Sequence, residues 1–141
     1  MIKRFIGVTI AVKDLNAAVK KYEGILGVKA QYMEAKDFAI PGMKGAFLRA
    51  FDVQITLLTS EQPDTSITKF LETRGEGVFL IGFEVDDAEK ARKELQEKGV
   101  QFVGDKPVSF SGGKVNFAHP KSMNGLQVEF AQINEDHKFK H

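Results

Sequence analysis

Few side chains in this sequence are suited to nucleophilic catalysis. The chain has no cysteine, which excludes disulfides, thiolate-bound zinc and a thiol nucleophile and is compatible with a reducing cytoplasm. Ser109, Ser111 and Ser122 lie close together in the second half, but none has an evident histidine–acid partnership. Gly112–Gly113 follows no strand–helix pattern, so it does not form a nucleotide-binding loop.

Histidine offers one candidate general base. Of the three histidines, only His119 stands inside the expected fold, whereas His137 and His141 belong to a polar tail over residues 133–141. His119 precedes Pro120, and a surface or turn-stabilising role is favoured over catalysis. Lys121 could meet a phosphate group, and an ordinary loop lysine is an equally good interpretation.

The composition is that of one globular domain. The chain has 141 residues, and 20 basic residues nearly balance 19 acidic ones. We therefore expect neither nucleic acid nor an anionic membrane as a partner. The N-terminal segment lacks a small-residue cleavage site, and no apolar run approaches the length of a membrane span. The expected location is cytoplasmic.

The sequence contains an internal repeat. Three pairs of segments recur in the same order at a spacing of 72 or 73 residues. They are Val12–Asp14 with Val85–Asp87, Gly27–Val28 with Gly99–Val100, and Val53–Leu58 with Leu126–Ala131. Ordered matches at nearly one spacing indicate two similar halves.

Each half is predicted to run strand, helix and three further strands. The apolar segment Phe5–Val12 is typical of a buried strand, Asp14 can cap a helix, and Gly27 can end it. In the second half, Asp87 can cap the helix and Gly99 can end it. The other strands are expected at about 29–36, 45–51, 53–59, 101–104, 114–118 and 126–132.

The halves cover about residues 1–62 and 76–132, with a linker helix over 63–75. Neither βαβββ module can bury a sheet face well alone, so the two should form one curved mixed sheet around a cleft. The predicted fold is therefore a single α+β domain over residues 1–132, followed by the tail.

Three segments carry a resemblance to a known family: IGVTIAVKDLNAAVKKYEGILGV, ITKFLETRGEGVFLIGFEVDD and GGKVNFAHPKSMNGLQVEF. The sequence resembles the vicinal-oxygen-chelate (glyoxalase/bleomycin-resistance) superfamily, and within it the methylmalonyl-CoA epimerases. The resemblance covers about residues 5–132, and its most epimerase-specific part is Gly112–Ser122. It implies a glyoxalase-like fold, an acyl-CoA-contacting loop around His119 and Lys121, and a homodimer.

The resemblance also implies four metal-ligand positions, where the family typically has His, Glu or Gln, His and Glu. In this sequence they are Gly7, Thr56, Leu80 and Glu129. Glycine offers no side chain, leucine no lone pair and threonine only a neutral hydroxyl. One carboxylate cannot hold a divalent cation at useful affinity, so no metal cofactor is expected.

The epimerase branch uses a further glutamate in the loop before its third strand. Here that loop is Phe38–Met43, which has no carboxylate, and the nearest acids, Glu34 and Asp37, are out of register. Epimerisation needs proton exchange on opposite faces of the substrate and an electrophile for the enolate oxygen. Epimerase activity is therefore expected only if a metal does bind.

Strand alternation predicts which side chains share the cleft. The residues expected to face it from the first strand of the first half are Phe5, Gly7, Thr9 and Ala11. Those expected to face it from the first strand of the second half are Val78, Leu80, Gly82 and Glu84. Ile6, Val8, Ile10, Phe79, Ile81 and Phe83 are expected to lie under the helices. The candidate ligand-binding residues are Thr9, Gln54, Thr56, Leu80, Gln127, His119 and Lys121.

Glu129 is the strongest candidate for a catalytic residue. Buried among apolar groups without a metal, its carboxyl should have a raised pKa and could accept a proton or donate a hydrogen bond. The alternative is a structural acid satisfied by a neighbouring glutamine or by Arg49. Glu84 is a weaker candidate, because it lies near a strand end where water can reach it.

Three functions fit these observations. The leading one is a metal-independent superfamily member that takes a small organic or acyl-CoA ligand into the cleft; as an enzyme it would be an isomerase or lyase using Glu129. The chief alternative is a non-catalytic small-molecule binder of the antibiotic-resistance type. Against it, such binders often stack ligands on aromatic side chains, and this chain has no Trp and two Tyr. A paralogue acting through a partner protein is the third reading, which the near-neutral charge does not support.

Overall fold

A computed structural model describes residues 1–136, which form one sheet and three α-helices. The eight strands are ordered β2-β3-β4-β1-β5-β8-β7-β6. The strands are β1 (Ile2–Ala11), β2 (Gln31–Tyr32), β3 (Met43–Ala50), β4 (Val53–Ser60), β5 (Gly77–Val85), β6 (Val108–Phe110), β7 (Gly113–Ala118) and β8 (Gln127–Ile133). The helices are α1 (Leu15–Leu26), α2 (Ser66–Arg74) and α3 (Ala88–Glu97), with short 3-10 turns at Ala35–Asp37 and Pro120–Ser122.

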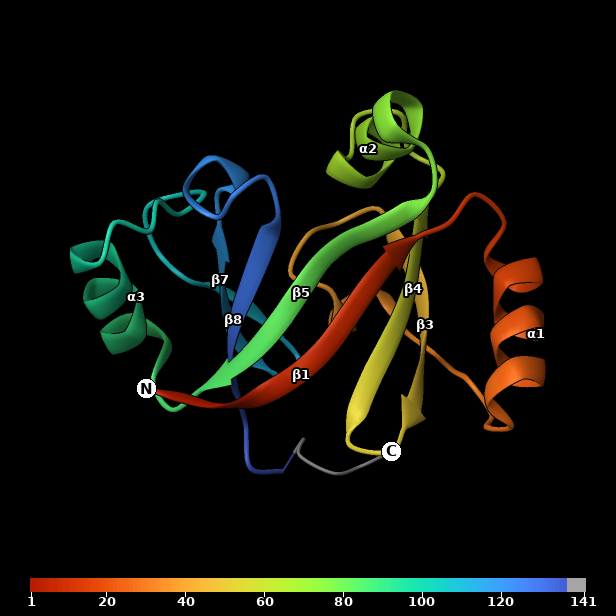
Figure 1. The fold of residues 1–141 in the computed structure, drawn as a ribbon, viewed down its shortest axis with the longest axis horizontal. Coiled ribbons are helices and arrows are strands. Elements are labelled where there is room, and N and C mark those ends of the chain that lie inside the picture. Colours follow the sequence, from red (N-terminus) through yellow and green to blue (C-terminus); the bar gives the residue numbers. More distant parts are fainter. Residues whose placement is uncertain (137–141) are drawn as a thin grey trace.

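Two βαβββ modules make up the sheet, as predicted. β1 pairs in parallel with β4, β5 pairs in parallel with β8, and β1 and β5 run antiparallel where the modules meet. These two strands cross the middle of the molecule, with α1 beyond β3 and β4 on one side and α3 beyond β7 and β8 on the other (Figure 1). The predicted α+β, glyoxalase-like fold is therefore confirmed. No helix of the described residues is long and apolar enough to cross a membrane.

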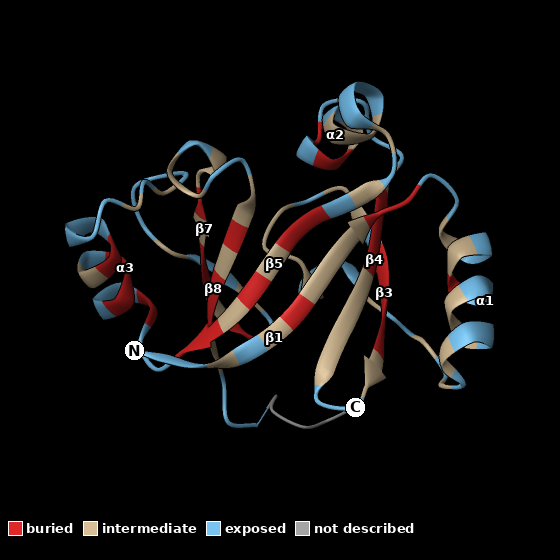
Figure 2. Cartoon of the chain, viewed as in Figure 1, coloured by how far each residue is buried: buried red, intermediate tan, exposed pale blue. Residues whose placement is uncertain are grey.

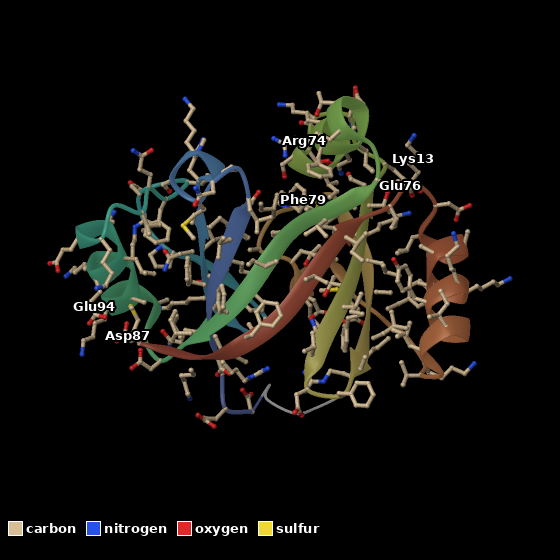
Figure 3. The ribbon with its side chains drawn as sticks, in the orientation of Figure 1. Lys13, Arg74, Glu76, Phe79, Asp87 and Glu94 are labelled. Atoms are coloured by element: carbon tan, nitrogen blue, oxygen red, sulfur yellow. The ribbon has the colours of Figure 1, made fainter. Side chains whose placement is uncertain are left out.

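The helices begin at the predicted capping residues. Asp14 accepts a hydrogen bond from the Ala17 amide, and Asp87 accepts bonds from two amides at the start of α3, where Figure 3 labels it. Gly27 ends α1 with φ of 71°, a left-handed conformation that glycine adopts without strain. Each helix turns its apolar side toward the sheet, and the buried residues of α3 and α2 face inward in Figure 2.

Two predicted strands differ from the structure. The segment 101–104 makes a single bridge, from Phe102 to Ala118. The strand that pairs with the outer side of β7 is β6 instead. Gly104 turns the chain at φ of 77°, and Pro107 has no amide hydrogen to donate to a ladder. The predicted strand 29–36 shortens to β2, because a 3-10 turn with a reciprocal cap between Glu34 and Asp37 follows it. Of the predicted tail, Ile133 is the last residue of β8, and residues 137–141 lie outside the described part of the chain.

A bulge in β1 changes which side chains face the cleft. Phe5 pairs with Phe83 and Gly7 with Gly82, so the ladder gains one residue at Ile6. The predicted orientation of Phe5 and Ile6 is therefore wrong. The Phe5 ring packs against that of Phe83, with 5.5 Å between centroids, and Ile6 turns into the cleft.

A second irregularity lies in β5. Thr9 pairs with Leu80 and Ile10 with Val78, so the ladder skips Phe79. Both Phe79 and Leu80 then reach the cleft, although Phe79 was predicted to lie under the helices. Its ring also packs against Phe70 of α2, below the part of α2 that carries Arg74 (Figure 3). Val78, predicted to share the face of Leu80, is half exposed and does not line the cleft.

Candidate functional site

The concave side of the sheet encloses a cavity of about 430 Å³ between the two modules. We call it the cleft cavity. Six of the eight predicted site residues line it: Thr9, Gln54, Thr56, Leu80, Gln127 and Glu129. They come from β4, β1, β5 and β8, the four central strands of the sheet, where the equivalent strands β1 and β5 lie side by side and the equivalent strands β4 and β8 flank them. The repeat predicted this convergence.

His119 and Lys121 do not line the cleft cavity. His119 caps the 3-10 turn Pro120–Ser122, since its Nδ1 accepts a hydrogen bond from the Lys121 amide at 3.1 Å. The turn-stabilising interpretation of His119 therefore has a structural basis. Lys121 is exposed beside it.

Glu129 lines the cavity from β8, flanked by Gly82 on β5 and Phe117 on β7. A Cβ atom at Gly82 would stand 3.4 Å from Glu129 Oε1, so the glycine leaves room for the carboxyl group over the strand. Burial raises the pKa of Glu129 from 4.5 to about 7. The side chain keeps some surface facing the cavity, but the surrounding protein removes it from bulk water.

No hydrogen bond or ion pair joins the Glu129 carboxyl group to any of residues 1–136. The alternative interpretation, a structural acid satisfied by a glutamine or by Arg49, therefore finds no contact to support it. Gln54, its neighbour in the cavity, donates instead to Thr56 Oγ1 at 3.3 Å. A carboxyl group with a pKa near neutrality and no protein partner can exchange a proton with a ligand or hydrogen-bond to it.

The residues at the family's metal positions do not fit a divalent cation. A Cβ atom at Gly7 would lie 1.7 Å from the backbone oxygen of Gln54, so the bulged strand admits no side chain there. Thr56 and Leu80 add no charge, which leaves Glu129 as the one anionic donor among the four positions. No group of three or more His, Cys, Asp or Glu within residues 1–136 could hold a metal ion.

A charged pair adjoins the cavity. Arg4 lines the cavity, and its Nε donates to Glu84 Oε1 at 2.8 Å. Glu84 is 3% exposed, so the expectation that water reaches it is wrong, and Lys3 stands 4.0 Å from its second oxygen. The sequence did not single out Arg4, because the bulge at Gly7 determines which way it points.

Asp37 is a second carboxylate of the cavity that sequence reasoning set aside as out of register. It accepts hydrogen bonds from Ser111 Oγ at 2.7 Å and from the Glu34 amide at 2.9 Å. The Ser111 amide also donates to the Lys36 carbonyl at 3.0 Å. These contacts join a loop of the first module to a turn of the second, and we call them the clasp.

Aromatic side chains supply much of the remaining surface. Five phenylalanines from both modules line the cavity: Phe38, Phe47, Phe79, Phe110 and Phe117. The lack of tryptophan therefore does not argue against an aromatic ligand, because phenylalanine offers the same kind of face. The hydrophobic pattern indicated that these residues were inside, and their convergence on one cavity appears only in three dimensions.

The fold and site together define a class: paired βαβββ modules whose concave sheet forms a small-molecule cavity. The model of the Glyoxalase/Bleomycin resistance protein/Dioxygenase superfamily matches residues 8–119, and the chain belongs to this superfamily.

Its relatives include acyl-CoA epimerases. The chain is 35% identical over 136 residues to the ethylmalonyl-CoA/methylmalonyl-CoA epimerase of Cereibacter sphaeroides, covering 94% of this chain and 100% of that protein. It is 32% identical over 127 residues to the mitochondrial methylmalonyl-CoA epimerase of Dictyostelium discoideum, covering 89% and 75%.

The chain is also similar to solved structures of methylmalonyl-CoA epimerases. The methylmalonyl-CoA epimerase from Mycobacterium tuberculosis matches with a TM-score of 0.85 at 27% identity, covering 96% of this chain and 91% of that one. A Streptomyces coelicolor methylmalonyl-CoA epimerase variant in complex with 2-nitronate-propionyl-CoA matches with a TM-score of 0.82 at 26% identity, covering 94% and 99%.

Proposed function

We propose that this protein binds an acyl thioester or related carbonyl compound in the cleft cavity and moves a proton at the carbon beside the carbonyl group. Glu129 is the acid–base group, and the reaction is an isomerisation or related lyase chemistry that needs no divalent metal. The single observation that carries the proposal is a cavity-lining carboxyl group with a pKa of about 7 and no partner among residues 1–136. Kinship with acyl-CoA epimerases supports the thioester.

The chemistry follows from the pKa. Near neutral pH both forms of Glu129 are populated, so the same group can take the α-proton and return it. Charge developing on the carbonyl oxygen needs hydrogen-bond donors, and Thr9 and Gln127 offer a hydroxyl and an amide on the cavity wall. Asp37 is the other carboxylate within the cavity and could serve the opposite face of the substrate.

The test is deuterium uptake at the α-carbon of propionyl-CoA, isobutyryl-CoA and phenylacetyl-CoA in D2O containing EDTA, followed by mass spectrometry. Wild-type protein should catalyse uptake into at least one thioester. Glu129→Gln should lower that rate by about a hundredfold or more while the protein stays folded. Glu97→Gln, a change on the exposed side of α3, is the matched control and should leave the rate unchanged. Uptake that survives Glu129→Gln would remove this role, and uptake abolished by EDTA would contradict metal independence.

A second function, non-catalytic binding of a small molecule, draws support from the five phenylalanines of the cavity. A protein of this kind would bind a thioester or an aromatic compound in calorimetry and show no deuterium uptake. The homodimer implied by the family resemblance stays a prediction.

A further inference from the structure

The charges of the cleft cavity are unfavourable for an anionic group. Of its lining residues, only Arg4, Asp37 and Glu129 can carry charge, so two carboxyl groups face one guanidinium. That guanidinium is already paired with the buried Glu84. A ligand carboxylate placed inside would lose its hydration and meet two groups of its own charge, and its one counter-ion among the lining residues already donates to Glu84.

The apolar surface of the cleft cavity favours an uncharged, apolar group. Phe79, Phe110 and Phe117 come from the second module, and Phe38 and Phe47 come from the first, so aromatic faces line the cavity from both sides. Phe117 pairs with Glu129 across the β7–β8 ladder, which puts one of these rings next to the proposed proton-transfer group. A ring or bulky apolar group beside a thioester carbonyl would fill this surface, with the carbonyl near Glu129.

We infer that the acyl group accepted by the cleft cavity is uncharged and apolar, with an aryl group fitting best, and that an acyl group with a second carboxylate is rejected. The inference rests on the proposed function, because it assigns the substrate class of the same site. It makes phenylacetyl-CoA, whose ring stands one carbon from the carbonyl, a better ligand than methylmalonyl-CoA, whose acyl group carries a free carboxylate.

The experiment is isothermal titration calorimetry of the full-length protein at pH 8 with phenylacetyl-CoA, methylmalonyl-CoA and free CoA. Phenylacetyl-CoA should bind at least about tenfold more tightly than methylmalonyl-CoA, and free CoA should bind more weakly than phenylacetyl-CoA. Equal or tighter binding of methylmalonyl-CoA would overturn the inference and leave the proposed function standing, with Arg4 leaving Glu84 for the ligand. If none of the thioesters binds better than free CoA, the proposed function fails as well.

Two variants test whether the phenylalanines of the cavity cause the preference for phenylacetyl-CoA. Phe117→Ala should weaken phenylacetyl-CoA binding by about tenfold and leave methylmalonyl-CoA binding nearly unchanged. Phe51→Ala is the matched control, because Phe51 lies at the tip of the β3–β4 hairpin and is 98% exposed. Should Phe117→Ala fold poorly, Phe110→Ala on the short strand β6 tests the same surface. An unchanged ratio of the two affinities in a folded Phe117→Ala or Phe110→Ala protein would contradict an aryl site.

Discussion

At the scale of single residues, the surroundings of Glu129 leave space for its carboxyl group, and no residue among 1–136 forms a hydrogen bond or ion pair with that group. Gly82 on one side has no side chain, and Phe117 on the other side has no polar atom. The carboxyl group is therefore desolvated with no charge or hydrogen bond to compensate, and its pKa rises to about 7. The same desolvation that raises the pKa of Glu129 also means that its ionised form lowers the free energy of unfolding.

This cost predicts a pH-dependent difference in stability between the wild type and Glu129→Gln. The pKa of Glu129 is about 7 in the folded protein against an ordinary value of 4.5, so between these pH values the folded state holds more protons than the unfolded state. The contribution of Glu129 to the free energy of unfolding therefore falls as pH rises through this window, by up to about 1.4 kcal/mol per pH unit. Well below pH 4.5 and well above pH 7 its contribution is flat.

Urea unfolding at pH 5, 6, 7 and 8 measures this difference. The Gln variant should gain stability relative to wild type as pH rises from 5 to 7, with only a small further gain at pH 8. Glu97→Gln corrects for the loss of a carboxylate in general. A difference that stays constant from pH 5 to 7 would show that Glu129 is not desolvated in the folded protein.

At the scale of secondary-structure elements, the bulge in β1 determines the character of the site. Gly7 has φ of 155° and lies so close to β4 that a Cβ atom would overlap the Gln54 carbonyl. Only glycine fits, and the extra residue turns Arg4 and Ile6 into the cleft cavity. The position from which the family provides a metal ligand here carries a backbone contact instead.

Gly7→Ala should consequently destabilise the protein by at least about 2 kcal/mol, because the strand pair must separate to admit the methyl group. Gly24→Ala is the matched control. Gly24 lies within α1, a Cβ atom there would meet nothing within 4 Å, and the change should stabilise the protein by about 0.5–1 kcal/mol. Chemical unfolding measures the free energy of unfolding of both variants. A Gly7→Ala protein as stable as wild type would mean that β1 and β4 can move apart freely.

The same bulge marks the limit of what the sequence could predict. The repeat, the helix caps and the convergence of Gln54, Thr56, Gln127 and Glu129 follow from periodicities of 3.6 and 2, which local sequence carries. Strict alternation fails where the ladder gains or skips a residue, so the predicted faces of Phe5 and Ile6 are wrong, and Phe79, which packs under α2 as predicted, also reaches the cavity. Asp37 and the five phenylalanines could not be placed, since contacts between the two modules bring them together.

At the scale of the whole molecule, the two modules that form the cleft cavity contact each other in two places. The central contact is the pairing of β1 with β5, and the second contact is the clasp formed by Lys36 and Asp37 with Ser111. The clasp residues Asp37 and Ser111 lie 74 positions apart, one in each module. Phe38 and Phe110 adjoin the clasp and line the cavity, so opening it would uncover the apolar interior.

Loosening the clasp should therefore speed ligand entry. Ser111→Ala removes the side-chain hydrogen bond to Asp37 and keeps the bond from the Ser111 amide to the Lys36 carbonyl. One such bond is worth about 1 kcal/mol, so the open form should become about fivefold more populated and the association rate of phenylacetyl-CoA should rise by a similar factor. Surface plasmon resonance with the immobilised protein measures that rate. Ser109→Ala is the control, since Ser109 is exposed on β6 and its side chain makes no hydrogen bond within the described chain. Equal association rates for the two variants would mean that ligands enter the cavity by a route that leaves the clasp closed.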